Sequence, residues 1–98
     1  MNRDLLIEKL KSTRPALEAK GVTHIALFGS RARGDFRPES DVDILLEVEP
    51  NSDFSILTLA SVQEIVSDAT GIVSNAVMRR SLRDKFKAAI APDIVEIF

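Results

Sequence analysis

Two aspartates in one short apolar stretch are the residues of this sequence best suited to chemistry. Asp41 and Asp43 lie two positions apart in "DVDILLEV" (41–48), a pattern that predicts a strand. Alternate residues of a strand point to the same face, so the two carboxylates share one face while Val42 and Ile44 point to the other. Two neighbouring carboxylates repel each other unless a cation compensates them. The pair therefore predicts a metal site.

The identity of the metal follows from the ligands. Carboxylate oxygens that share a cation with phosphate oxygens are typical of Mg²⁺, which rarely occupies an all-protein cage. Two ions held about 3.5–4 Å apart are used in phosphoryl transfer, where they bind the attacking and leaving oxygens. Asp41 and Asp43 therefore predict two Mg²⁺ ions and a substrate that brings phosphate.

A Gly-Ser turn before this strand supplies a place for that phosphate. Gly29 and Ser30 follow the apolar run "THIALF" (23–28), which predicts another strand. Glycine lets the backbone approach a ligand closely, and Ser30 can cap a short helical turn that ends at Gly34. Free N–H groups at such a turn attract anions.

Arg31 and Arg33 lie within this turn and add positive charge. The alternative interpretation is an ordinary turn followed by solvent-facing acids on an edge strand. Gly-Ser, ten residues, Asp, one residue and Asp should coincide by chance only about once in a thousand chains of this size, given ordinary residue frequencies. The combination therefore favours a phosphate site beside a metal site.

Hydrophobic periodicity predicts the elements that position these residues. We expect a small mixed sheet with helices packed on one face, an α/β (α+β) fold. Phenylalanines 28, 54 and 86 are expected in its core. The expected strands are 23–28, 41–48, 72–77 and 93–98, and the expected helices are 2–20 with an interruption at Pro15, 54–69 and 80–90.

Composition excludes several classes of protein. There is no cysteine, which excludes disulfides, thiolate zinc sites and cysteine nucleophiles and is typical of a cytoplasmic protein. No apolar run approaches the roughly 18 residues of a membrane span, and the N-terminus lacks a signal-peptide pattern. The net charge of −2 argues against direct nucleic-acid binding, and the basic segment 79–87 is expected to be a solvated helix face. The 98 residues predict a single domain over 1–98.

The segment 29–48 resembles the signature of the polymerase-β-like nucleotidyltransferase superfamily, specifically its minimal, antitoxin-type bacterial members. The resemblance covers nearly the whole chain. It implies a nucleotidyltransferase fold, ATP as donor, and transfer of a nucleoside monophosphate to an acceptor hydroxyl with loss of pyrophosphate. The matching residues are Gly29, Ser30, the Ala-Arg-Gly at 32–34, Ser40, Asp41 and Asp43.

The resemblance also implies roles for single residues. Asp41 and Asp43 would bind Mg²⁺, Gly29 and Ser30 would hold the triphosphate, and Arg33 would assist the phosphates. The candidate nucleotide-binding residues are Gly29, Ser30, Arg31, Arg33 and Ser40, and the candidate catalytic residues are Asp41, Asp43 and Asn75.

Asn75 marks a departure from the superfamily pattern. A third carboxylate normally lies on a later strand, where it completes one metal site and helps to deprotonate the acceptor. Alignment of the following basic segment places Asn75 there, with Ser74 as the alternative register. An amide can offer an oxygen to a metal but cannot accept a proton as a carboxylate does. Asp93 or Glu96, beside the last expected strand, could replace the missing acid.

Two functions follow from this pattern. The first is Mg²⁺-dependent transfer of AMP from ATP to a partner protein, which the resemblance implies is a small helical toxin. The alternative is a catalytically impaired antitoxin subunit that binds nucleotide and acts by docking to its partner, as the neutral Asn75 favours. A free-standing small-molecule transferase is disfavoured, because no second domain is expected to bind the small molecule. Exposed sheet edges would suit a homo-oligomer or a partner complex.

Overall fold

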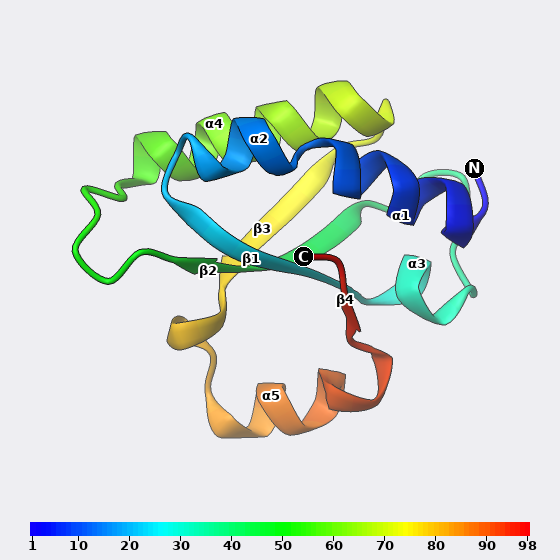
Figure 1. Ribbon diagram of the computed structural model, residues 1–98. Coiled ribbons are helices and arrows are strands. Elements are labelled where there is room, and N and C mark those ends of the chain that lie inside the picture. Colours follow the sequence, from blue (N-terminus) through cyan, green and yellow to red (C-terminus); the bar gives the residue numbers. More distant parts are fainter.

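A four-stranded mixed sheet forms the centre of the protein (Figure 1). The computed structural model describes all of residues 1–98. The strands are arranged in the order β3-β2-β1-β4, with β1 antiparallel to β2 and β4, and β2 parallel to β3. Their bounds are β1 Val22–Phe28, β2 Val42–Val48, β3 Ser74–Met78 and β4 Val95–Glu96.

Five helices and two short 3₁₀ turns connect the strands, in the order that the sequence predicts. The parallel pair β2 and β3 is joined by the longest helix, α4, which crosses over one face of the sheet (Figure 1). None of the helices has the length and apolar character needed to cross a membrane. The helices are α1 Arg3–Ser12, α2 Arg14–Glu18, α3 Ser30–Arg33, α4 Ile56–Thr70 and α5 Asp84–Ile90, and the 3₁₀ turns are η1 Arg79–Ser81 and η2 Ala91–Asp93.

Side-chain caps fix the ends of the long helices. The Asn2 side chain accepts a hydrogen bond of 2.8 Å from the Leu5 N–H at the start of α1. Ser55 and Thr58 form a reciprocal capping box at the start of α4, which therefore begins two residues later than periodicity predicts. Gly71 ends α4 in the left-handed conformation, as predicted.

The main core lies between the sheet and the helices α1, α2 and α4. Val42, Ile44 and Leu46 point into it from β2, as strand alternation predicts. Their partners include Leu6 and Leu10 of α1. The α+β class and the mixed sheet are thereby confirmed.

The expectation that helices cover only one face is wrong, because α5 lies on the opposite face (Figure 1). Ile90 of α5 packs against Ala26, Phe28 and Leu45, which form a second, smaller buried cluster. These strand residues are apolar on the side away from the main core, so both faces of β1 and β2 need cover. The same face carries the polar residues of the candidate site.

The expectation of exposed sheet edges does not hold at β3, because side chains of α4 cap this edge. The Ala76 N–H donates to Gln63 Oε1 at 2.9 Å, and the Ser74 N–H donates to Ser67 Oγ at 3.1 Å. Outward N–H groups of an edge strand otherwise offer a template for strand addition. With these donors satisfied, β3 is a poor site for pairing with a further strand.

Candidate active site

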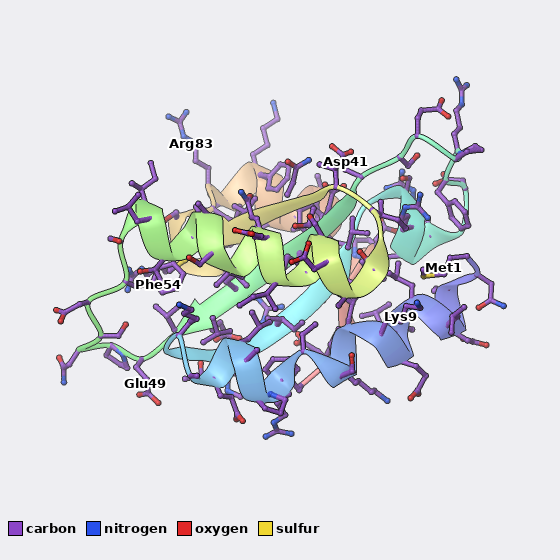
Figure 2. The ribbon with its side chains drawn as sticks, turned by 90° about the horizontal axis from the view of Figure 1, so that it is seen from above. Met1, Lys9, Asp41, Glu49, Phe54 and Arg83 are labelled. Carbon is purple, nitrogen blue, oxygen red and sulfur yellow. The ribbon has the colours of Figure 1, made fainter.

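The two aspartates lie at the end of the sheet where β2 begins. Asp41 directly precedes β2 and Asp43 is its second residue, on the same face as Leu45. Figure 2 shows Asp41 at the end of the molecule near α3, far from Glu49 and Phe54 at the other end. Because β1 ends and β3 begins at this same end, three strands bring residues together here.

Asn75 of β3 completes the group. It stands in register with Asp43 in the parallel pair, which favours Asn75 over Ser74 as the residue at the expected third position. Its side-chain amide nitrogen donates to Asp41 Oδ2 at 2.9 Å and to Asp43 Oδ1 at 3.4 Å. Ser74 instead turns to α4, where its hydroxyl donates to the Gln63 carbonyl. A neutral donor thus links two like charges.

Gly29 lies against Asp43. Its φ of +77° is in the left-handed half of backbone space that favours glycine. A Cβ added to Gly29 would collide with Asp43 Oδ2 and would lie 3.3 Å from Asp43 Cγ. The turn and the carboxylate therefore fit together only because position 29 has no side chain.

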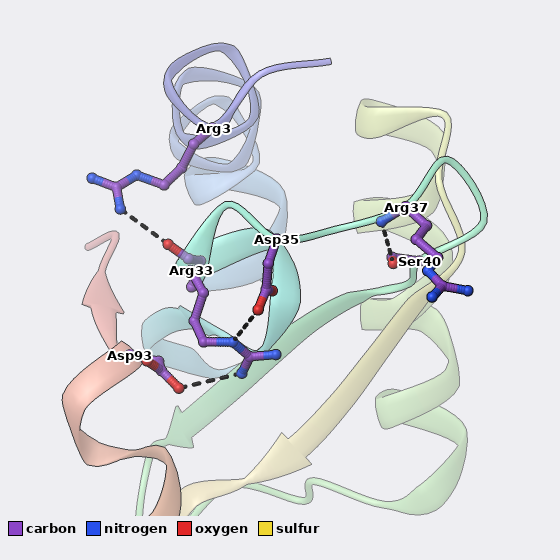
Figure 3. A network of polar contacts seen from close by, with 7 residues as sticks. Arg3, Arg33, Asp35, Arg37, Ser40 and Asp93 are labelled. Atoms are coloured by element: carbon purple, nitrogen blue, oxygen red, sulfur yellow. Dashed lines mark hydrogen bonds and ion pairs between the residues drawn. The ribbon is translucent and has the colours of Figure 1, made fainter.

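The helical turn predicted after Gly29 is α3, which spans Ser30–Arg33 and is followed by Gly34 at φ +90°. The expectation that Ser30 caps this turn is wrong, because Gly29 is the N-cap and no side chain accepts a capping hydrogen bond. Its first N–H groups have no carbonyl partner within the turn. The Ala32 carbonyl at its other end accepts a hydrogen bond of 3.0 Å from Arg3 Nη1, which ties α3 to α1 (Figure 3). The turn is thus anchored beside the aspartates.

Arg33 is the arginine of this turn that faces the site. Its guanidinium donates to Asp35 at 3.1 Å and to Asp93 at 3.3 Å (Figure 3). These two hydrogen bonds, with Asp35 as the stronger partner, raise the pKa of Arg33. Its positive charge also opposes the rise in the pKa of Asp43.

Arg31 has a different placement from the one expected of a phosphate ligand. Its side chain is buried, donates to the carbonyls of Ser40 at 2.9 Å and Pro38 at 3.4 Å, and lies 4.6 Å from the centre of the Phe36 ring. Arg31 therefore holds the loop that leads into Asp41. The Ser40 hydroxyl is also used in this loop, where it accepts a hydrogen bond of 2.9 Å from the Arg37 N–H (Figure 3).

No third acid joins the pair. Asp93 binds Arg33, and Glu96 binds Arg79 at 2.8 Å. The chain contains no group of three histidine, cysteine, aspartate or glutamate side chains placed to hold a metal ion. The structure therefore does not support the prediction that Asp93 or Glu96 replaces the missing carboxylate. Asp93 instead forms an ion pair with Arg33 beside the site, a contact that the sequence did not predict.

The surroundings of Asp43 disfavour the charged form of its carboxyl group. Burial raises its pKa, the hydrogen bond from Asn75 lowers it, and the neighbouring Asp41 carboxylate raises it again. The net direction is upward. Two like charges that are only partly compensated by an amide are chemically suited to a divalent cation. Asp41 and Asp43 fit Mg²⁺ as oxygen ligands, and Asn75 could add its amide oxygen.

This electrostatic cost predicts that Asp43→Asn stabilises the metal-free protein. A carboxyl whose folded pKa lies above its unfolded value binds more protons when folded, so the free energy of unfolding falls as the pH rises between the two values. At pH 7 in a chelator, we expect urea unfolding to show a gain of about 1 kcal/mol or less, which shrinks as the pH approaches 4. Glu49→Gln, at an exposed position at the opposite end of the molecule (Figure 2), is the matched control. An equal gain in the free energy of unfolding at pH 7 and near pH 4 would mean that the raised pKa of Asp43 is not its cause.

Comparison with known proteins finds relatives among the nucleotidyltransferases. The family model described as "Nucleotidyltransferase domain" matches residues 6–97. The protein adenylyltransferase MntA of Thermococcus cleftensis is 31% identical over 80 residues, which cover 82% of this chain and 79% of the relative. A provisionally named protein adenylyltransferase of Methanocaldococcus jannaschii is 33% identical over 93 residues, covering 92% of each chain.

Solved structures share the fold at lower identity. A provisionally described minimal nucleotidyltransferase superposes with a TM-score of 0.79 at 22% identity, covering 97% of this chain and 95% of that one. A chain from a toxin–antitoxin crystal structure with AMP-PNP gives a TM-score of 0.69 at 16% identity, covering 90% of this chain and 72% of that one. A chain from the complex of a tri-AMPylated Shewanella oneidensis HEPN toxin with MNT antitoxin gives 0.68 at 16%, covering 98% and 71%.

The mixed sheet and its helices form the fold of a minimal nucleotidyltransferase. The match over residues 6–97 makes the assignment specific: the chain belongs to the nucleotidyltransferase domain family. Within that family it resembles the minimal nucleotidyltransferases, and its fold is similar to that of chains in toxin–antitoxin complexes.

Proposed function

We propose that this protein transfers AMP from ATP to a hydroxyl group of a partner protein, and that it is the antitoxin of a toxin–antitoxin pair. The observation that carries the proposal is the packing of the Asp43 carboxylate against Gly29, which places the carboxylates next to the Gly-Ser turn. Relatives that are 31% and 33% identical are named protein adenylyltransferases, which supports a protein as acceptor.

The residues divide the chemistry between them. The turn at Gly29 and Ser30 would hold the triphosphate through its N–H groups, and Arg33 would exchange its aspartate partners for phosphate oxygens. Asp41 and Asp43 would hold Mg²⁺, which when bound neutralises charge on the phosphate oxygens. These residues would orient the α-phosphorus toward the acceptor hydroxyl.

The transfer itself is a displacement at the α-phosphorus. The acceptor oxygen forms a bond to phosphorus, the bond to the oxygen bridging the α- and β-phosphates breaks, and pyrophosphate leaves with that oxygen. The acceptor proton passes to water or to an aspartate of the pair, because the amide of Asn75 cannot accept it. Loss of a dedicated base typically slows such steps by a factor of about 10²–10⁴.

A second candidate function rests on this same residue. Asn75 bonds to both carboxylates, and no other acid stands in its place. The alternative is an antitoxin subunit that binds nucleotide but neutralises its partner by docking. The two candidates agree on nucleotide binding and differ in whether AMP is transferred.

Label from α-phosphate-labelled ATP tests the proposal directly. We expect the wild-type protein, added with Mg²⁺ to a lysate of its host, to transfer label to a protein band, and Asp43→Asn to transfer none. Glu49→Gln should label as the wild type does, since this residue is exposed at the opposite end of the molecule (Figure 2). Binding of ATP without any labelled protein would favour the docking function. Failure to bind ATP would overturn both.

A further inference from the structure

Phe86 of α5 is exposed although it lies on the covered side of its helix. The side chain of Ile90, one helical turn later, is 8% exposed and packs against the sheet. Residues four apart lie on the same face of a helix, so Phe86 also points toward the sheet. It is nevertheless 44% exposed, and the expectation that it belongs to the core is wrong.

The exposed ring lies close to the aspartate pair. Phe86 packs edge-to-face on Phe28, with ring centroids 6.1 Å apart and an interplanar angle of 88°. Phe28 stands directly opposite Asp43 in the antiparallel register of β1 and β2. Opposed residues on neighbouring strands share a face and have Cβ atoms about 4.5–5.5 Å apart. One ring therefore separates Phe86 from the candidate metal ligand.

No other aromatic ring offers free surface at this place. The chain has five phenylalanines and neither tyrosine nor tryptophan. Phe28 is 7% exposed, and Phe54 packs against the main core. The Phe36 ring is covered by the Arg31 guanidinium, whose Cζ lies 4.6 Å from the ring centroid. The Phe98 ring is covered in the same way by Arg14, at 5.4 Å.

We infer that Phe86 forms one wall of a subsite for the nucleobase of the donor nucleotide. This inference rests on the proposed function. The side chains at the phosphate end of the site are polar, namely Asp41, Asp43 and Asn75, and they offer nothing to a flat aromatic base. An exposed aromatic face joined to the site through Phe28 provides a stacking surface.

A contact surface for the partner protein is the competing use of this ring. Exposed apolar residues for such a contact exist elsewhere, since Ile56 and Leu57 at the start of α4 are 81% and 78% exposed. Neither is aromatic. The register between Phe28 and Asp43 favours the nucleobase, because it joins Phe86 to the carboxylates that face the phosphates.

A fluorescence titration distinguishes the two uses. Phe86→Trp introduces the only tryptophan of the chain, and a base stacked on indole quenches its emission. With Mg²⁺ present, we expect ATP to quench this variant, whereas tripolyphosphate, which has the phosphates without the base, should not. Leu57→Trp places the same reporter on α4 and should respond to neither ligand. Equal responses of Phe86→Trp to both ligands would overturn the inference.

Calorimetry of Phe86→Leu gives the size of the effect. Stacking of one base on an aromatic side chain corresponds to about 5- to 150-fold in affinity, so we expect the Kd for ATP to rise about tenfold. The Kd for tripolyphosphate should change by less than about twofold, and Leu57→Ala should leave both values unchanged.

The outcomes separate the inference from the proposed function. If wild-type protein binds tripolyphosphate as tightly as ATP, or if Phe86→Leu weakens both ligands equally, the nucleobase subsite is wrong while the triphosphate site stands. If wild-type protein binds neither ligand, the proposed function fails as well. Loss of partner binding by Phe86→Leu with unchanged ATP affinity would assign the ring to the partner.

Discussion

Replacing Gly29 by alanine should weaken triphosphate binding by about 100-fold or more. Two effects combine at this position. The φ of +77° costs an alanine about 1 kcal/mol or more, and the new Cβ collides with the Asp43 carboxylate. Relief of the collision must move either the turn that would hold the phosphates or the aspartate that would hold Mg²⁺. Loss of one or two hydrogen bonds to the charged phosphates corresponds to about 100-fold or more in affinity, so we expect the Kd for ATP with Mg²⁺ to rise at least about 100-fold.

Gly34 provides a matched control for this substitution. It ends the same turn with a φ of +90°, but a Cβ there meets no atom within 4 Å. Gly34→Ala therefore lacks the collision. With a ψ of 4°, Gly34 lies in the left-handed helical region, where an alanine costs about 1 kcal/mol of unfolding free energy, less than at Gly29, whose ψ of −159° lies in a region essentially restricted to glycine. Gly34→Ala should keep most of the ATP affinity. Calorimetry and thermal unfolding of both variants separate the two effects. Equal loss of ATP affinity in both would mean that backbone strain, not the Asp43 contact, controls the site.

The sequence predicted the centre of the site because its signals are local. Asp41 and Asp43 share a face through strand alternation, and the turn at Gly29 follows from the chemistry of glycine and serine. The place of Asn75 came from alignment with the superfamily pattern, and the register Asp43↔Asn75 agrees with it. Each of these inferences required only a strand or a turn to form where its own residues favour it.

Long-range contacts account for the failures. Arg33 and Asp93 are 60 positions apart, and hydrophobic periodicity does not predict their ion pair. α5 packs on the second face of the sheet because β1 and β2 carry apolar side chains on both faces. A short apolar run in the sequence does not show whether one face or both will be buried. Residue type alone predicts that Phe86 lies in the core, whereas its exposure depends on what α5 leaves uncovered.

Arg31 shows a further limit of pattern reasoning. Its position in the turn is the same kind of evidence that points to Arg33, two residues later. The structure separates them, since Arg31 is buried against backbone carbonyls and Arg33 is exposed beside Asp93. Charge near a motif therefore identifies candidates, while the direction of each side chain decides which of them can reach a ligand.

Asn75→Asp should convert the site into one that depends on Mg²⁺. The present amide donates to Asp41 and Asp43, and a third carboxylate would replace both hydrogen bonds with repulsion. In a chelator we expect the free energy of unfolding to fall by about 1–2 kcal/mol, because hydrogen bonds to charged groups are lost. Millimolar Mg²⁺ should restore it. Asn51→Asp, a loop asparagine exposed away from the site, is the matched control and should respond to neither condition.

The same variant should transfer label faster if the neutral residue limits catalysis. A carboxylate at position 75 can accept the proton of the attacking hydroxyl, and such bases contribute about 10²–10⁴-fold, so a rise of at least tenfold in the rate of AMP transfer is expected. Restored stability in Mg²⁺ without faster transfer would mean that the metal site is complete but the proton leaves by another route. If the variant shows neither restored stability nor faster transfer, then Asn75 does not occupy the position of the third acid.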